Sequence, residues 1–149
     1  MAYTLQAFIG DLPDLKQHAP SGAVIVSLDQ GKGMIPLGDD FRRLHKIPFL
    51  PMTDDGWKEI PSAIKSITEN FKGSIAYVEA EFFGSGGTQA AVIWKEGDLI
   101  FGPLVNVRAI NQALRILGVT KGTCFDEFDA LGLGKHRGTN GWIRSSNVQ

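Results

Sequence analysis

The stretch IAYVEAEFFGSGGTQAAVIWKEGDLIF, residues 75–101, decides the predicted fold. Residues 75–83 alternate between two sets of side chains, and residues 88–95 are rich in strand-forming types. GSGG and KEGD, which separate the three apolar runs, are turn sequences. We therefore predict a β-meander of three antiparallel strands, the third over residues 99–101.

The glycine cluster at residues 84–87 is interpreted as a hairpin turn. A phosphate-binding glycine loop leads into a helix, whose N-terminal amides meet the anion, and a P-loop adds Lys and Ser or Thr. These glycines instead lead into a predicted strand and lack that continuation. A four-residue loop, with positive φ at its glycines, predicts that Glu79 pairs with Val92 and Tyr77 with Trp94.

That register puts two glutamates among aromatic residues on one face of the sheet. Glu79 and Glu81 share the face with Tyr77, Phe83 and Trp94. The face can hold an acid/base pair or a hard cation, bind a partner, or lie half-exposed under a helix. Nothing on the adjacent strands completes a catalytic set, so binding of a partner is favoured over catalysis. The third interpretation, a half-exposed strand face with a purely structural role, remains open.

Two amphipathic helices accompany the meander. Apolar residues recur every three or four positions over residues 57–71 and again over residues 107–117. Proline is tolerated only in the first turn of a helix. If Pro61 does not fit the first turn of the helix at residues 57–71, the regular helix begins at Pro61. We expect Gly102 and Pro103 to end the third strand of the meander.

The first third of the chain is mixed. It contains a predicted strand at residues 3–9, a hairpin from residues 23–28 and 34–37, and a short helix over residues 40–47. Strands grouped in meanders, with helices between the groups, indicate an α+β fold with a mainly antiparallel sheet. We predict one globular domain over residues 1–149, with the last few residues disordered.

Composition limits the classes of partner. Fifteen basic and sixteen acidic residues give a net charge of -1, without a basic block to neutralise a row of phosphates, so no nucleic acid is expected. The single cysteine, Cys124, completes neither a disulfide nor a zinc site. No signal peptide or membrane-length apolar run is evident. We predict a cytoplasmic protein with no metal, cofactor or membrane association.

The C-terminal segment brings together unlike charges. Asp126, Glu127 and Asp129 precede His136 and Arg137 by a few residues. Carboxylates, imidazole and guanidinium can form a hydrolytic or anion-binding site. A flexible loop whose charges pair in water is the alternative, and it is favoured over catalysis.

Four segments resemble a recurrent pattern in small uncharacterised bacterial proteins, and together they cover about half of the chain. They are AYVEAEFFG, QAAVIW, INQALRILGV and DEFDALGLGKHR. In size, α+β organisation and lack of a complete catalytic set, the chain also resembles the immunity proteins of bacterial contact-dependent and type VI toxin systems. That resemblance implies a cytoplasmic protein that binds a cognate toxin domain and blocks its active site, and it assigns no binding residue.

Our leading hypothesis from the sequence is a non-enzymatic binding protein of the immunity type. The alternative is a small hydrolase or ligand-binding enzyme that uses Glu79 or Glu81 with His136 and Arg137, if the C-terminal loop folds back over the meander. A third possibility is a homodimer that pairs through an exposed strand edge. The predicted partner-binding residues are Tyr77, Glu79, Glu81, Trp94, Asp126, Glu127, Asp129, His136 and Arg137.

Overall fold

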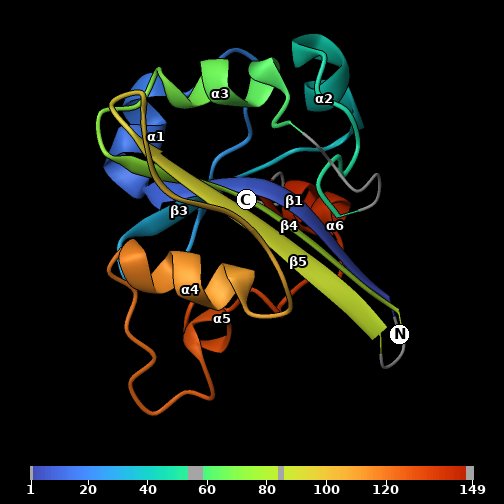
Figure 1. Cartoon of the computed structure of the whole chain (residues 1–149), viewed down its shortest axis with the longest axis vertical. Coiled ribbons are helices and arrows are strands. Elements are labelled where there is room, and N and C mark those ends of the chain that lie inside the picture. The colour runs from blue at the N-terminus through green and yellow to red at the C-terminus, as the bar shows by residue number, and fades with distance from the viewer. Residues whose placement is uncertain (1, 54–58, 84–85, 147–149) are drawn as a thin grey trace.

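The computed structural model describes residues 2–53, 59–83 and 86–146. They form one domain around a six-stranded sheet in the order β2-β3-β1-β4-β5-β6, with every neighbouring pair antiparallel (Figure 1). The predicted α+β class is confirmed. The strands are β1 Tyr3–Asp11, β2 Val26–Ser27, β3 Lys32–Pro36, β4 Ser74–Phe83, β5 Gly86–Lys95 and β6 Asp98–Val105.

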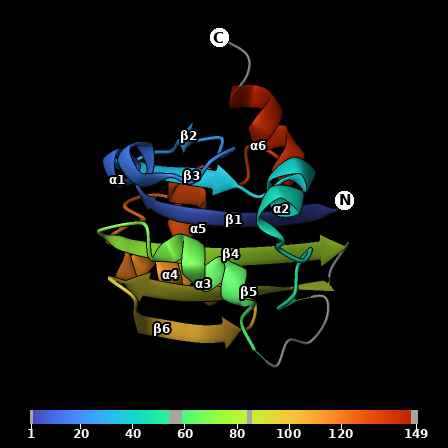
Figure 2. The ribbon, with the colours of Figure 1, turned by 90° about the horizontal axis from the view of Figure 1, so that it is seen from above.

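Helices cover both faces of the sheet (Figure 2). One face carries α1 Leu12–His18, α2 Asp39–His45 and α3 Ser62–Thr68. The other carries α4 Ala109–Ile116 and α5 Glu127–Ala130, and α6 Thr139–Ser146 also packs into that core. None of the helices in the described residues is long and apolar enough to cross a membrane.

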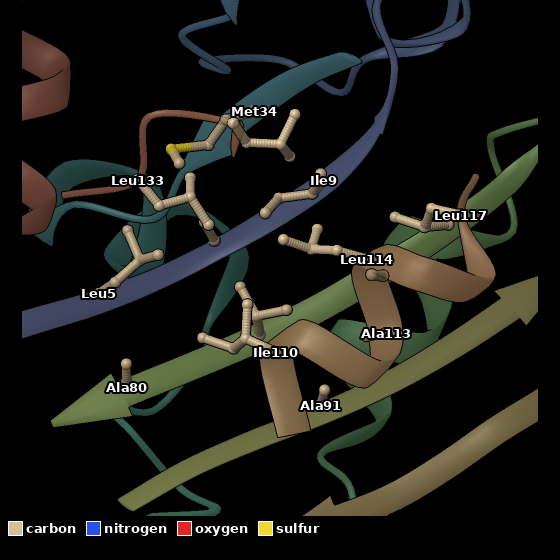
Figure 3. Packing of buried hydrophobic residues seen from close by; sticks show 14 of the residues in the cluster. Leu5, Ile9, Met34, Ala80, Ala91, Ile110, Ala113, Leu114, Leu117 and Leu133 are labelled. Atoms are coloured by element: carbon tan, nitrogen blue, oxygen red, sulfur yellow. The ribbon is translucent and has the colours of Figure 1, made fainter. Parts of the chain in front are cut away.

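The central strands are apolar on both sides, and this produces two cores. Alternation sends Ala76 and Val78 toward α4, whereas Ile75 and Tyr77 face α3. Figure 3 shows the first core, in which Ile110 of α4 packs over the sheet. Because both faces are covered, the expected half-exposed face of β4 is in fact buried at Tyr77, Glu79 and Trp94.

The predicted hairpin register is wrong by two residues. Glu79 pairs with Ala90, and Val92 lies opposite Tyr77, because β5 already begins at Gly86. A shift of two residues keeps every side chain on its own face, so the predicted sharing of one face by Glu79, Tyr77 and Trp94 is correct.

Gly87 is required because the backbones of β4 and β5 approach closely at this position, and not because its φ is positive. A Cβ atom at Gly87 would lie 2.6 Å from the carbonyl oxygen of Glu81 and 2.7 Å from Cα of Phe82. A Cβ atom at Gly86 would find its nearest neighbour, the carbonyl oxygen of Phe83, at 3.9 Å. The two adjacent glycines therefore have different structural requirements.

Two further element boundaries differ from the prediction. β6 continues through Gly102 and Pro103 to Val105, with a register shift opposite Val92 that the positive φ of Gly102 accommodates. α4 begins at Ala109, which leaves Val107 exposed.

The helix predicted over residues 57–71 begins only after Pro61. This agrees with the alternative prediction, in which the regular helix starts at this proline. Its predicted first turn at Trp57, like the chain end at residues 147–149, lies outside the described residues. Residues 132–138, the predicted C-terminal loop, contain no helix, but the polar residues after them form α6, whose Trp142 is buried in the first core.

Candidate functional site

A gap beside β1 determines where the site forms. β3 reaches only as far as Ala7 on β1, where Pro36 is the last paired residue, so the beginning of β1 extends past it. The C-terminal segment fills this gap: the N–H of Thr4 donates to the carbonyl oxygen of Arg137 at 2.8 Å. Gly138 forms a parallel bridge with Thr4. The two ends of the chain are thus joined at one edge of β1.

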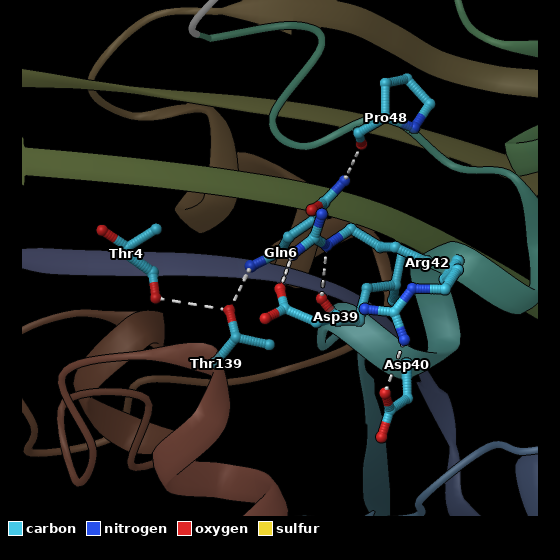
Figure 4. A network of polar contacts seen from close by, with 9 residues as sticks. Thr4, Gln6, Asp39, Asp40, Arg42, Pro48 and Thr139 are labelled. Atoms are coloured by element: carbon cyan, nitrogen blue, oxygen red, sulfur yellow. Dashed lines mark hydrogen bonds and ion pairs between the residues drawn. The ribbon is translucent and has the colours of Figure 1, made fainter.

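Gln6 anchors both segments that border the gap. Its backbone N–H donates to Oγ1 of Thr139 at 3.1 Å, and its carbonyl oxygen accepts from the N–H of Leu37 at 2.9 Å (Figure 4). Thr139 begins α6, and Leu37 is separated from the start of α2 at Asp39 only by Gly38. The starts of these two helices are therefore held close to each other by one residue of the sheet.

A cleft of about 690 Å³ opens between the two helix starts. Its size lies within the range of small-molecule sites. The charged and imidazole side chains of its lining are Arg42, Lys135, His136, Arg137, Arg144 and a single carboxylate, Asp39. A chain with a net charge of -1 thus gathers positive charge in one place.

The carboxylate of the cleft is already used. Asp39 accepts a hydrogen bond from Nη2 of Arg42, and the Arg42 guanidinium lies 4.8 Å from the centroid of the Phe49 ring. Within the described ranges, Lys135, Arg137 and Arg144 form no ion pair with a carboxylate. Three cations therefore face the cleft without a counter-charge from the described residues.

Glycine lets the imidazole lie against α6. A Cβ atom at Gly141 would be 3.0 Å from Cβ of His136, tighter than ordinary van der Waals contact. The His136 ring meets the Trp142 ring edge-on, with centroids 4.6 Å apart. Because Trp142 is buried, this contact fixes the imidazole in the wall of the cleft.

The N-terminal turn of α6 adds to the positive potential. Thr139, Asn140 and Gly141, the first residues of this eight-residue helix, all line the cleft. Free amides and the helix dipole favour an anion at such an end. The N–H of Gly141 donates to the carbonyl oxygen of Gly138 at 3.0 Å, which leaves the N–H groups of Thr139 and Asn140. The cleft therefore combines exposed cationic side chains with backbone donors, which is the chemistry that binds phosphate or carboxylate groups.

Glu79 lies outside this cleft and has a structural role. Its carboxylate accepts from the N–H of Met52 at 3.1 Å, the N–H of Thr53 at 2.9 Å, Oγ1 of Thr53 at 3.0 Å and the Tyr77 hydroxyl. Burial raises the pKa of Glu79, and the four donors oppose that shift. Glu79 thereby ties the segment after α2 to the sheet.

This placement changes the partner-binding assignment made for β4 and β5. Tyr77, Glu79 and Trp94 are buried, so a partner cannot contact them without displacing α3 or the residues before it. Glu81 is only partly covered. The cleft that His136 and Arg137 line contains neither glutamate, so the structure does not assemble the predicted acid/base set.

The C-terminal acids separate from His136 and Arg137. Asp126 caps α5 by accepting from the N–H of Asp129 at 2.8 Å, and Arg115 donates to Glu127 at 3.4 Å. Burial of Glu127 opposes ionisation, but hydrogen bonds and the charges of Arg115 and Lys121 outweigh it and lower the pKa of Glu127. Asp126 and Glu127 border a different cavity, of about 520 Å³, beside α4.

Several residues of the cleft had no individual signal in the sequence. Lys135 is adjacent to His136 and Arg137, whereas Arg144 lies beyond the segment that drew attention in the sequence, and nothing there indicated that both residues line one cleft. Arg42 and Phe49 are almost a hundred residues away from that segment along the chain. Only the gap beside β1 brings the two segments together.

Comparisons with known proteins find no similar protein. No family model matches the chain, no curated protein matches it in sequence, and no solved structure matches it in fold. In the part of the chain that the structure describes, no group of three or more His, Cys, Asp or Glu side chains is placed to hold a metal ion.

Proposed function

We propose that this protein is a non-catalytic binding protein that takes an anionic ligand in the basic cleft between α2 and α6. The observation that carries the proposal is the set of three cations, Lys135, Arg137 and Arg144, that line one cleft without a carboxylate partner in the described residues. Like charges held together repel one another, and a bound anion relieves that repulsion.

The distribution of carboxylates favours binding over hydrolysis. A hydrolytic site needs a general base within reach of the substrate, and an imidazole in that role is usually oriented by a carboxylate. Among the described residues, His136 of the cleft forms no ion pair or hydrogen bond with a carboxylate. Asp39, the one carboxylate among the described lining residues, is engaged by Arg42. Glu79, which the sequence offered as a base, is enclosed by four donors in the core.

Calorimetric titration with inorganic pyrophosphate at low ionic strength tests the proposal. We expect binding that Arg137→Gln and Arg144→Gln each weaken at least about tenfold, since a hydrogen bond to a charged group contributes about 1.5–3 kcal/mol. Lys95→Gln, at an exposed cation on β5, is the matched control and should leave the affinity unchanged. The proposal fails if the wild type does not bind, or if all three variants bind equally.

A second candidate is the immunity type of function, in which a protein partner docks beside α4 and α5. Phe125 is 87% exposed, far more than any other large apolar side chain of the described residues, and Val107 close by on the same cavity is 59% exposed. Exposed aromatic residues flanked by charge are typical anchors of protein interfaces. Asp126 and Glu127 border this cavity, so part of the predicted acidic group would contribute.

Protection of cells tests this second candidate. When the product of an adjacent gene arrests growth, co-expression of this protein should restore growth, and Phe125→Ala should remove that protection while leaving the melting temperature unchanged. Growth that is not restored by the wild-type protein would exclude it. Arg137→Gln separates the two proposals, because only anion binding depends on Arg137.

A further inference from the structure

We infer that the anionic ligand is a nucleotide unit, with its phosphates on the residue 135–144 side of the cleft and its base stacked against Phe49. This inference rests on the proposed anion-binding function and names the class of ligand. The supporting observation is that the exposed phenyl ring of Phe49 lines the cleft together with the cations. Binding of a simple anion would not explain this ring.

Phe49 and Arg42 form a prepared stacking surface. The phenyl ring is 45% exposed, and the Arg42 guanidinium lies 4.8 Å from its centroid. Arg42 is held in place by Asp39 and by its own Nε, which donates to the carbonyl oxygen of Leu37 at 3.3 Å. Aromatic rings and guanidinium planes are the surfaces on which nucleobases stack.

The opposite part of the lining suits phosphate groups. Lys135, Arg137 and Arg144 supply charge, and the start of α6 supplies backbone donors. Several cations spread over ten residues match a ligand with more than one negative charge. A ligand that satisfies both parts therefore joins a flat ring to phosphates.

An adjoining cavity provides room for the remainder of such a ligand. Its volume is about 450 Å³, and it shares Gly38, Asp39 and Asn140 with the basic cleft. Ile143 and other apolar residues line this cavity together with the carboxylates of Asp39 and Asp40, and these carboxylates and the amide of Asn140 can bond hydroxyl or amino groups. Ribose and nucleobases carry such groups, whereas a bare phosphate does not.

Affinity measurements on matched ligands test the inference. We expect adenosine 5′-diphosphate to bind at least about tenfold more tightly than pyrophosphate or phenyl phosphate, because stacking and the sugar contacts are added to the same charges. Phe49→Ala should reduce the affinity for adenosine 5′-diphosphate at least about fivefold and leave that for pyrophosphate unchanged. Phe125→Ala, at an exposed phenyl ring remote from the cleft, is the control.

The outcomes separate this inference from the proposed function. If pyrophosphate binds but adenosine 5′-diphosphate and phenyl phosphate bind no more tightly, the nucleotide inference is overturned and the anion site stands. Phenyl phosphate binding as tightly as the nucleotide also overturns it. If no anion binds, both fail. Phe49→Leu repeats the test should Phe49→Ala not fold, as judged by its melting curve.

A nucleotide unit can belong to a free nucleotide or to a single strand of nucleic acid. A hexamer of deoxyadenylate distinguishes these two sources. If the hexamer binds more tightly than the mononucleotide, with an affinity that falls steeply as salt rises, the unit belongs to a single strand. Equal affinities assign the site to the free nucleotide. Either result supports a nucleotide unit, and failure of both ligands to exceed pyrophosphate contradicts it.

Discussion

At the scale of single residues, Glu79 shows how a carboxylate can belong to a core. Residues 52 and 53 turn their backbone N–H groups toward the sheet, and the Glu79 carboxylate accepts from both. The Tyr77 hydroxyl donates to the same group and accepts from Nε2 of Gln6 at 2.9 Å. The network holds the residues after α2 in place, and Phe49 of the cleft belongs to that segment.

The raised pKa of Glu79 predicts a pH dependence of stability. Burial places the folded-state pKa above the value in the unfolded chain, which is about 4.3 for glutamate. Between the two values the folded protein holds the extra proton, so the stabilisation is complete below pH 4.3 and is lost as pH rises through the folded-state pKa. Glu79→Gln does not titrate and should lack this loss.

Urea unfolding at a series of pH values from 4 to 8 measures the effect. The stability of the wild type relative to Glu79→Gln should fall by about 1.4 kcal/mol for each pH unit between the two pKa values. Glu69→Gln, at an exposed carboxylate after α3, is the control and should follow the wild type. A difference that stays constant with pH would contradict the assignment.

At the scale of elements, the β4–β5 hairpin depends on Gly87 more than on its neighbour Gly86. Gly87→Ala places a methyl group 2.6 Å from a carbonyl oxygen of β4, so the strands must separate locally. We expect a loss of about 1–3 kcal/mol in the free energy of unfolding, the usual cost of overpacking. Gly86→Ala makes only an ordinary van der Waals contact, 3.9 Å from the carbonyl oxygen of Phe83, and should change stability by less than about 0.5 kcal/mol. Equal effects in chemical denaturation would show that the close approach is absent.

Element boundaries also show where local sequence is insufficient. The alternation of β4 and the apolar stripe of α4 are properties of consecutive residues, so both elements were predictable. The end of β6 was not, because a bulge at Gly102 lets a strand pass a glycine-proline pair that usually ends one. The sequence of the first turn of α6 is polar and by itself predicts a loop. The helix becomes understandable only because Trp142 is buried in the core.

At the scale of the whole molecule, α6 closes the fold by joining the C-terminal segment to the first strand. Trp142→Ala removes a buried indole from the core beneath α4 and should lower the free energy of unfolding by about 3–5 kcal/mol. Because Asn140 and Arg144 are carried by α6, pyrophosphate affinity should fall as well. Phe125→Ala, an exposed aromatic truncation, should leave both unchanged. Normal stability of Trp142→Ala would mean that α6 is dispensable to the core.

The candidate site itself was only partly predictable. His136 and Arg137 were recognised as residues able to bind an anion, and both line the cleft. They were grouped with carboxylates near them in sequence, such as Glu127, but Arg115 pairs with that carboxylate on another surface. Proximity along the chain predicted a mixed charge cluster, whereas the folded chain separates the two signs.

The sequence by itself determined the class of fold, the two-sided strand β4 and the sharing of one face by Glu79, Tyr77 and Trp94, because these follow from side-chain periodicity along consecutive residues. Tertiary structure alone decided that this face is buried and that the basic cleft exists. Burial depends on which helices cover a face. The cleft depends on the gap that a short β3 leaves beside β1, where residues from opposite ends of the chain meet.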